Sequence, residues 1–183
     1  MDERAVDDLP RQARAVLEAG RAHGLEPDVR EFPAGTRTAA DAARAVGCSV
    51  GQIVKSLVFL ADDRPVLVLT SGANLVDTDK IAKQMDAAEV RKADADQARA
   101  ATGYAIGGTP PFGHVRPLEV LIDQDLTRLG TVWAAAGTPR HVFALASGDL
   151  VRATGGRVCD VAQGRPRAGA TGAFPPVEET PNP

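Results

Sequence analysis

Two apolar runs rich in β-branched residues, with a polar turn between them, constrain the fold of this chain more than any other feature. The first run covers residues 53–60 and the second covers residues 65–69. Between them lies Asp62-Asp63-Arg64, which has the composition of a tight turn. Runs of this kind predict β-strands, and the short turn predicts that they pair as an antiparallel hairpin.

Further strands and helices are expected on both sides of this hairpin. Short strands are predicted over residues 29–32, 118–122, 132–135, 142–145 and 157–161. Helices are predicted from Val6 to near Gly20 or Gly24, over residues 39–46, around Ile81, Ala82 and Met85, and over residues 95–101, with a last helical turn from Ser147 or Asp149. Thr38, Asp77 or Thr78, and Asp94 with Gln97 are suitable helix caps, and Gly47 can end the helix over residues 39–46 in the left-handed conformation. Because strands outnumber helices and come in adjacent pairs, the pattern favours an α+β fold with a mixed, mostly antiparallel sheet.

Length and composition indicate one domain followed by a tail. The 183 residues suit a single folded unit, which we expect to span residues 3–162. Residues 163–183 are rich in proline and glycine and poor in large apolar side chains, so this tail is predicted to be disordered. The 18 Gly and 13 Pro of the whole chain also disfavour a bundle of long helices.

Charge and cysteine content narrow the class of function. A formal net charge of −3 argues against a broad phosphate-binding surface, so DNA is not an expected partner. No apolar run approaches the roughly 20 residues that cross a bilayer, so no membrane contact is expected. The two cysteines form neither a disulfide framework nor a CxxC unit, which fits a reducing compartment, and we expect a cytoplasmic location.

Lys55 is unusual because it lies inside the first apolar run. Alternation along a strand places it on the face of Ile53, Leu57 and Phe59. An unpaired ammonium among such neighbours is costly, which points to a cavity, a partner anion or a function. The alternative is a lysine whose stem packs while its ammonium reaches water. A phosphate-binding loop is excluded, because Val54 stands where that motif has glycine and a strand follows.

A loop rich in glycine and proline, residues 102–114, is the second unusual segment. Gly107 and Gly108 can adopt conformations closed to other residues and present N–H groups to an anion or a carbonyl oxygen. The alternative is an ordinary connecting loop. His114 ends this segment, and either a structural hydrogen bond or a catalytic role fits it. Asp123 and Asp125 are interpreted as turn and cap residues.

Metal and nucleophile motifs are missing from the sequence. No pair among the three histidines has metal-ligand spacing, so no metal or other cofactor is expected. No G-x-S-x-G elbow occurs either.

Several separated motifs together resemble the YbaK family of aminoacyl-tRNA deacylases, which is related to the editing domain of bacterial prolyl-tRNA synthetases. They are the Lys55 strand, the segment from Asp77 to Lys83, and the loop 102–114, with further similarity at residues 121–123, 135–139 and 150–155. The resemblance covers roughly residues 25–162. It implies a barrel-like sheet with surrounding helices.

The resemblance also implies a metal-independent hydrolase that removes a wrong amino acid from tRNA, in trans and as a free-standing protein, with a prolyl tRNA as one candidate substrate. Its expected catalytic residues are Lys55, Gly107 and Gly108, because an ammonium and fixed N–H groups can stabilise a developing oxyanion. Water, a ribose hydroxyl or a substrate side chain would then attack the ester, so no protein nucleophile is required. Aminoacyl-tRNA, through its acceptor end, and a tRNA synthetase are the expected partners.

The remaining residues expected to contact the substrate or the tRNA are chosen by their positions in the sequence. Substrate binding is expected from Phe32, Ser56, Thr109, Pro111, His114, Ala135 and Gly137, and tRNA contact from Lys80 and Lys83. Arg91 and Lys92 are further candidates for the acceptor end. Ala135 departs from the serine or histidine of relatives specific for mischarged prolyl tRNA, which leaves the edited amino acid open. A non-catalytic module that binds a nucleotide, an aminoacyl-adenosine or a partner protein is the alternative function, and a small-ester hydrolase is a third.

Overall fold

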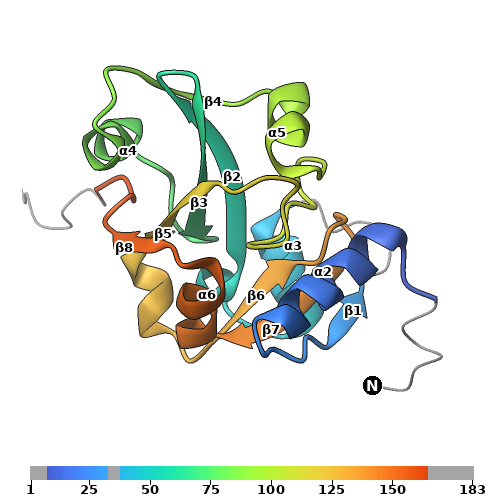
Figure 1. Ribbon diagram of the computed structural model, residues 1–183. Helices are drawn as coiled ribbons and strands as arrows, with labels where there is room; N and C mark the ends of the chain where they lie inside the picture. The colour runs from blue at the N-terminus through green and yellow to red at the C-terminus, as the bar shows by residue number, and fades with distance from the viewer. Residues whose placement is uncertain (1–7, 33–37, 165–183) are drawn as a thin grey trace, which may run out of the picture.

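The computed structural model describes residues 8–32 and 38–164, and Figure 1 shows how their helices and strands are arranged. The helices are α2 (Arg11–Ala22), α3 (Ala39–Val46), α4 (Thr78–Met85), α5 (Ala95–Thr102) and α6 (Ser147–Thr154), with 3-10 helices η1 (Val50–Gln52) and η2 (Gln124–Arg128). The strands are β1 (Val29–Glu31), β2 (Val54–Ala61), β3 (Arg64–Ser71), β4 (Val90–Lys92), β5 (Glu119–Asp123), β6 (Thr131–Ala135), β7 (His141–Ala146) and β8 (Arg157–Cys159). Most of the predicted tail lies outside the described residues, and no described helix is long and apolar enough to cross a membrane.

The predicted hairpin forms the centre of the larger sheet. Strands β2 and β3 pair antiparallel along their whole length, from Val54 opposite Ser71 to Ala61 opposite Arg64. Asp62 and Asp63 both have positive φ, 46° and 63°, as the tightest two-residue hairpin turns require. The five-stranded order is β4-β2-β3-β5-β8, in which β5 runs parallel to β3 and β8 parallel to β5. The predicted α+β class with a mixed sheet is confirmed.

A second, three-stranded antiparallel sheet has the order β1-β7-β6. It meets the larger sheet at a parallel bridge between Ile53 and Trp133, at the start of β2. No closed barrel is found among the described strands, so the barrel-like closure implied by the family resemblance stays a prediction. The bridge holds two sheet edges together at one point and lets them diverge beyond it.

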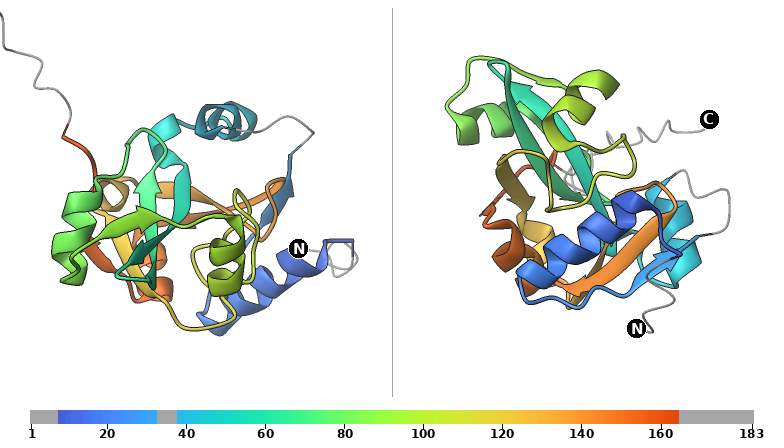
Figure 2. Two further views of the ribbon diagram at one scale, coloured as in Figure 1. Left: turned by 90° about the horizontal axis from the view of Figure 1, so that it is seen from above. Right: turned by 45° about the vertical axis from the view of Figure 1, so that its right-hand side comes forward.

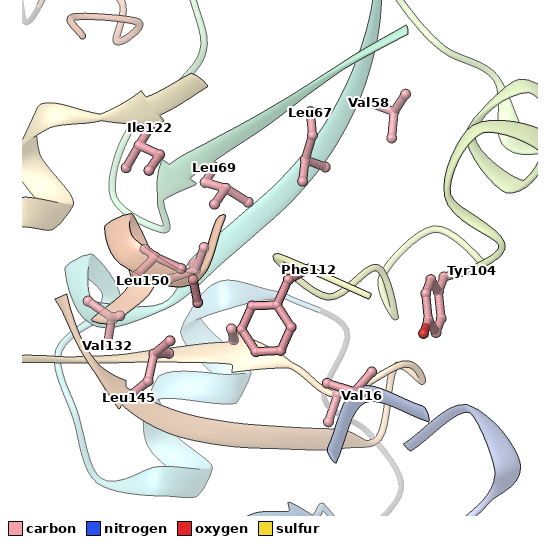
Figure 3. Close-up of a cluster of buried hydrophobic side chains, with 14 of the residues drawn as sticks. Val16, Val58, Leu67, Leu69, Tyr104, Phe112, Ile122, Val132, Leu145 and Leu150 are labelled. Carbon is pink, nitrogen blue, oxygen red and sulfur yellow. The ribbon is translucent and has the colours of Figure 1, made fainter. Parts of the chain in front are cut away.

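The main core fills the space between the two sheets. Figure 3 shows Leu67, Leu69 and Ile122 of the larger sheet facing Val132 and Leu145 of the smaller one, with α2, α6 and the loop after α5 closing the sides. The opposite face of the larger sheet packs on α4 through a second cluster that includes Phe59 and Ile81. In Figures 1 and 2, α4 and α5 therefore lie on opposite sides of the hairpin.

Local sequence signals set most helix ends as predicted. Thr38 and Asp41 form a capping box at α3, and Gly47 ends that helix in the left-handed conformation at φ 72°. Asp94 and Gln97 form the same box at α5. Strand β4 was not predicted.

Candidate active site

A cavity of about 490 Å³ opens where the two sheets diverge. Its walls come from β2, from β6 and β7, from α3 and α5, and from the loop after α5. Six of the residues predicted for the site line it: Phe32, Lys55, Ser56, Gly107, Thr109 and Ala135. Most of the remaining wall is apolar, and sequence reasoning missed Ile53, Trp133 and Val142 there because such residues read equally well as core. An apolar hollow with few polar groups is typical of a small-molecule site.

One side of the cavity is the edge of β2. Strand β4 pairs with β2 only from Phe59 to Ala61, and the Ala93 N–H then bonds to the Val58 carbonyl at 3.0 Å. No described strand pairs with residues 54–57 on that side beyond the Ile53–Trp133 bridge. The Ser56 peptide groups point the same way as the Val58 carbonyl, because backbone direction alternates along a strand. The Ser56 hydroxyl is buried and has no hydrogen-bond partner among the described residues.

Lys55 lies on this edge, half-buried, with its side chain on the face that carries Leu57 and Phe59. Its ammonium donates a hydrogen bond to the backbone carbonyl of Asn74, in the segment after β3. Burial lowers the pKa of Lys55, the nearby Asp123 carboxylate opposes that change, and Lys92 adds to it. As predicted, Lys55 carries its amine in a partly buried position, and burial disfavours the charged form of that amine.

Asp123 at the end of β5 is fully buried and binds four donors. Its carboxylate accepts from the Thr70 hydroxyl at 3.0 Å, the Ser71 N–H at 3.1 Å, the Asn74 side-chain amide at 2.8 Å and the Asp125 N–H at 3.0 Å. The last bond caps η2, which confirms the predicted turn role. The other three link Asp123 to the segment that holds Lys55, and no local sequence signal indicated them.

The glycine-rich loop reaches the cavity at Ile106, Gly107 and Thr109. Gly107 has φ 84°, a conformation that favours glycine, and no backbone partner is found for its N–H within the described part of the chain. The expected donor role of the Gly108 N–H is not supported, because that group bonds to the Ala105 carbonyl at 3.0 Å. A Cβ on Gly108 would lie 2.7 Å from the Thr138 Cα, so Gly108 serves close packing of two loops.

Three other predicted residues, Pro111, His114 and Gly137, do not line the cavity. Pro111 is buried, and the His114 ring bonds to the Pro110 carbonyl at 2.9 Å. Burial lowers the pKa of His114, and so favours the neutral imidazole, while that hydrogen bond opposes the change. Gly137 has φ 83°, and a Cβ there would lie 2.6 Å from the Gln12 carbonyl of α2.

The cations divide between two sides of the larger sheet. Lys80 on α4 is paired with Asp160 at 2.6 Å and with the Ala162 carbonyl at 2.7 Å. Neither Lys80 nor Lys83 lines the cavity, so tRNA contact by α4 stays a prediction that this geometry does not favour. Lys92, at the end of β4, is exposed and does line the cavity.

Comparisons with known proteins agree with this fold and site. A solved structure of a candidate trans-editing enzyme for prolyl tRNA synthetase superposes with a TM-score of 0.82 at 44% identity, covering 86% of this chain and 100% of that one. The uncharacterized protein YwhH of Bacillus subtilis is 32% identical over 68% of this chain and 80% of its own length. A proline–tRNA ligase of Lactobacillus gasseri is 34% identical over 50% of this chain, which spans only 16% of that ligase.

The apolar cavity beside a lysine-bearing strand edge and a glycine loop defines an editing-type hydrolase. Residues 33–153 match the aminoacyl-tRNA editing domain, and the chain belongs to that family. This confirms the resemblance stated from the sequence, and with it the predicted class of enzyme, an aminoacyl-tRNA deacylase.

Proposed function

We propose that this protein acts in trans on mischarged tRNA for proline and hydrolyses the ester that joins the wrong amino acid to the terminal ribose. One observation supports this most: in a member of the editing family, Lys55 and Gly107 line one apolar cavity. The solved relative described as a candidate trans-editing enzyme for prolyl tRNA synthetase supports the choice of tRNA.

The chemistry needs positioned donors rather than a protein nucleophile. Attack of water, or of a group on the substrate, on the ester carbonyl carbon places negative charge on the carbonyl oxygen. Cleavage of the ester bond then returns the ribose hydroxyl and frees the amino acid. An ammonium has three N–H donors, and the Asn74 carbonyl takes one of them, so Lys55 keeps two for an oxyanion or a phosphate. The Gly107 N–H is a second donor for the developing charge.

The cavity walls favour an apolar amino acid. Phe32, Trp133, Ala135 and Val142 present no charged group. A cationic side chain buried here would lose its water and meet only the like charges of Lys55 and Lys92, which costs several kcal/mol or more. We therefore expect a small apolar amino acid to be removed faster than a cationic one.

Binding of the tRNA itself is confined to the acceptor end. A net charge of −3 does not support wide contact with phosphates, and Lys92, an exposed cation that lines the cavity, is the residue expected to meet the terminal phosphodiester. Such a substrate is found where translation takes place, so the proposal includes a cytoplasmic location.

Release of labelled amino acid from a panel of charged tRNAs tests the proposal. Each member carries one amino acid on the tRNA for proline, and correctly charged prolyl tRNA is the control. Multiple-turnover release from at least one mischarged tRNA, with the prolyl form left intact, is expected. Release from none of them contradicts the proposal, and saturable binding of an aminoacyl-adenosine analogue without turnover would instead show a binding module.

Replacement of Lys92 with alanine is expected to weaken substrate binding in a salt-dependent way. Loss of one phosphate contact lowers the slope of log KM against log salt concentration by about 1. Arg14→Ala is the control, because Arg14 is an exposed cation on α2 that does not line the cavity. An unchanged slope in Lys92→Ala would rule out the phosphate contact.

A further inference from the structure

Lys55 is held by a network of buried polar groups that the chemistry above does not use. Asn74 is the link in this network. Its backbone carbonyl accepts from the Lys55 ammonium, and its side-chain amide donates to Asp123 at 2.8 Å and to Asp125 at 2.9 Å. One residue therefore contacts the lysine through its main chain and two carboxylates through its side chain.

We propose that Asp123 is a positioning residue for Lys55: its buried carboxylate fixes the segment from Thr70 to Asn74, and the Asn74 carbonyl then holds the ammonium at the cavity edge. The inference rests on the proposed function for the task of Lys55, but the network itself does not depend on it.

Hydrogen bonds to Asp123 restrain the segment that carries the Asn74 carbonyl. Thr70 lies opposite Lys55 in the β2–β3 register, and its hydroxyl donates to Asp123 at 3.0 Å. The Ser71 N–H donates to the same carboxylate oxygen at 3.1 Å. Three of the bonds to Asp123 thus restrain the chain on which the Asn74 carbonyl sits. A long side chain such as lysine loses much rotamer freedom when it is fixed, so a rigid acceptor is needed to hold it in one place.

The charge of Asp123 also acts on the Lys55 ammonium. The charged groups around Lys55 are Asp123 from β5, Asp125 from η2 and Lys92 from β4, while on α4 Lys80 is paired with Asp160 and Asp77 caps the helix. Burial and Lys92 both favour the neutral amine, whereas Asp123 favours the ammonium. Asp123 therefore restrains the acceptor of the ammonium and also favours its charged form.

The pH dependence of deacylation distinguishes this role from a merely structural one. If the protonated lysine is the active form, activity falls as pH rises through its pKa. Asp123→Asn removes the group that raises this pKa, so the basic limb of log kcat/KM should move to lower pH by roughly one unit. Lys92→Ala removes a group that lowers the pKa, so the limb should move to higher pH. The uncatalysed hydrolysis at each pH is subtracted.

A direct titration separates the inference from the proposed function. The chain has four lysines, Lys55, Lys80, Lys83 and Lys92, so the side-chain NMR signal of Lys55 is assigned by its loss in Lys55→Met. A lower Lys55 pKa in Asp123→Asn supports the network even if no tRNA is deacylated. An unchanged Lys55 pKa and an unchanged pH profile would overturn the proposal, whatever the activity.

Two further variants distinguish a change in the position of Lys55 from a folding defect. Asn74→Ala keeps the backbone carbonyl but removes the amide that links it to Asp123 and Asp125. A roughly 10-fold or greater fall in kcat with little change in KM is expected, because the ammonium loses its fixed position. Asp62→Asn is the matched control, since this carboxylate accepts the Ala88 and Glu89 N–H groups at the far end of the hairpin. It should leave the pH profile unchanged, and an equal shift in this variant would contradict the proposal.

Discussion

Replacing Lys55 with methionine is expected to lower kcat/KM for deacylation by about 100- to 1000-fold, the usual effect of losing one oxyanion donor. Methionine has a similar length but no donor, so the change removes the charge and leaves the packing nearly intact. Burial lowers the pKa of Lys55, which means that folding works against the charged form. The free energy of unfolding should therefore stay the same or rise at pH 7.

Release kinetics and chemical denaturation on the same preparation check both parts. Arg14→Met, an equivalent change on the exposed face of α2, serves as the control and should retain activity. If Lys55→Met turns over as fast as the wild type, the lysine has no role in the reaction. If it unfolds instead, Lys55 is a structural residue of the sheet edge.

Gly108→Ala is expected to damage both folding and activity. The added methyl group would lie 2.7 Å from the Thr138 Cα and 2.9 Å from the Thr138 carbonyl carbon, and a backbone neighbour cannot rotate away as a side chain can. Overpacking of this kind costs about 1–3 kcal/mol of unfolding free energy. The loop must shift to relieve the clash and carries Gly107 with it, so kcat/KM should fall by about 100-fold.

Gly130→Ala provides the comparison, because a Cβ at Gly130 meets no atom within 4 Å. Thermal unfolding and release kinetics are measured for both variants. Equal behaviour of the two glycine variants would show that the approach of Gly108 to Thr138 does not hold the loop. Loss of activity in Gly108→Ala without loss of stability would indicate that the shift is confined to the loop.

Local structure followed closely from the sequence. The hairpin was predicted from two β-branched runs and a polar turn, and the helix ends at Thr38, Gly47 and Asp94 from residues whose side chains or backbone conformations act on their neighbours. These signals work because the interactions they describe span only a few residues. The parallel pairing of β3 with β5 was not predictable in this way, since β5 lies some fifty residues away in the chain.

The site was predicted in part, for the same physical reason. Lys55 stood out because a charge inside an apolar strand is costly, and Gly107 because its loop is rich in glycine and proline. Trp133 carried no such signal, yet it lines the cavity. The donor role expected of Gly108 is not supported, because its N–H bonds to the Ala105 carbonyl within the loop, a conformation that composition does not reveal.

The sequence by itself determined the α+β class, the family and the two segments that bear the chemistry, because each depends on residue type and short spacing. Only the tertiary structure decided that these segments share one cavity, that α4 lies on the other side of the hairpin, and that Asp123 reaches Lys55 through Asn74. Asp123 and Asn74 are 49 residues apart, and their contact depends on the parallel pairing of β3 with β5 inside the larger sheet. Asp123 therefore caps a turn, as its sequence position indicates, and also acts on Lys55 through Asn74.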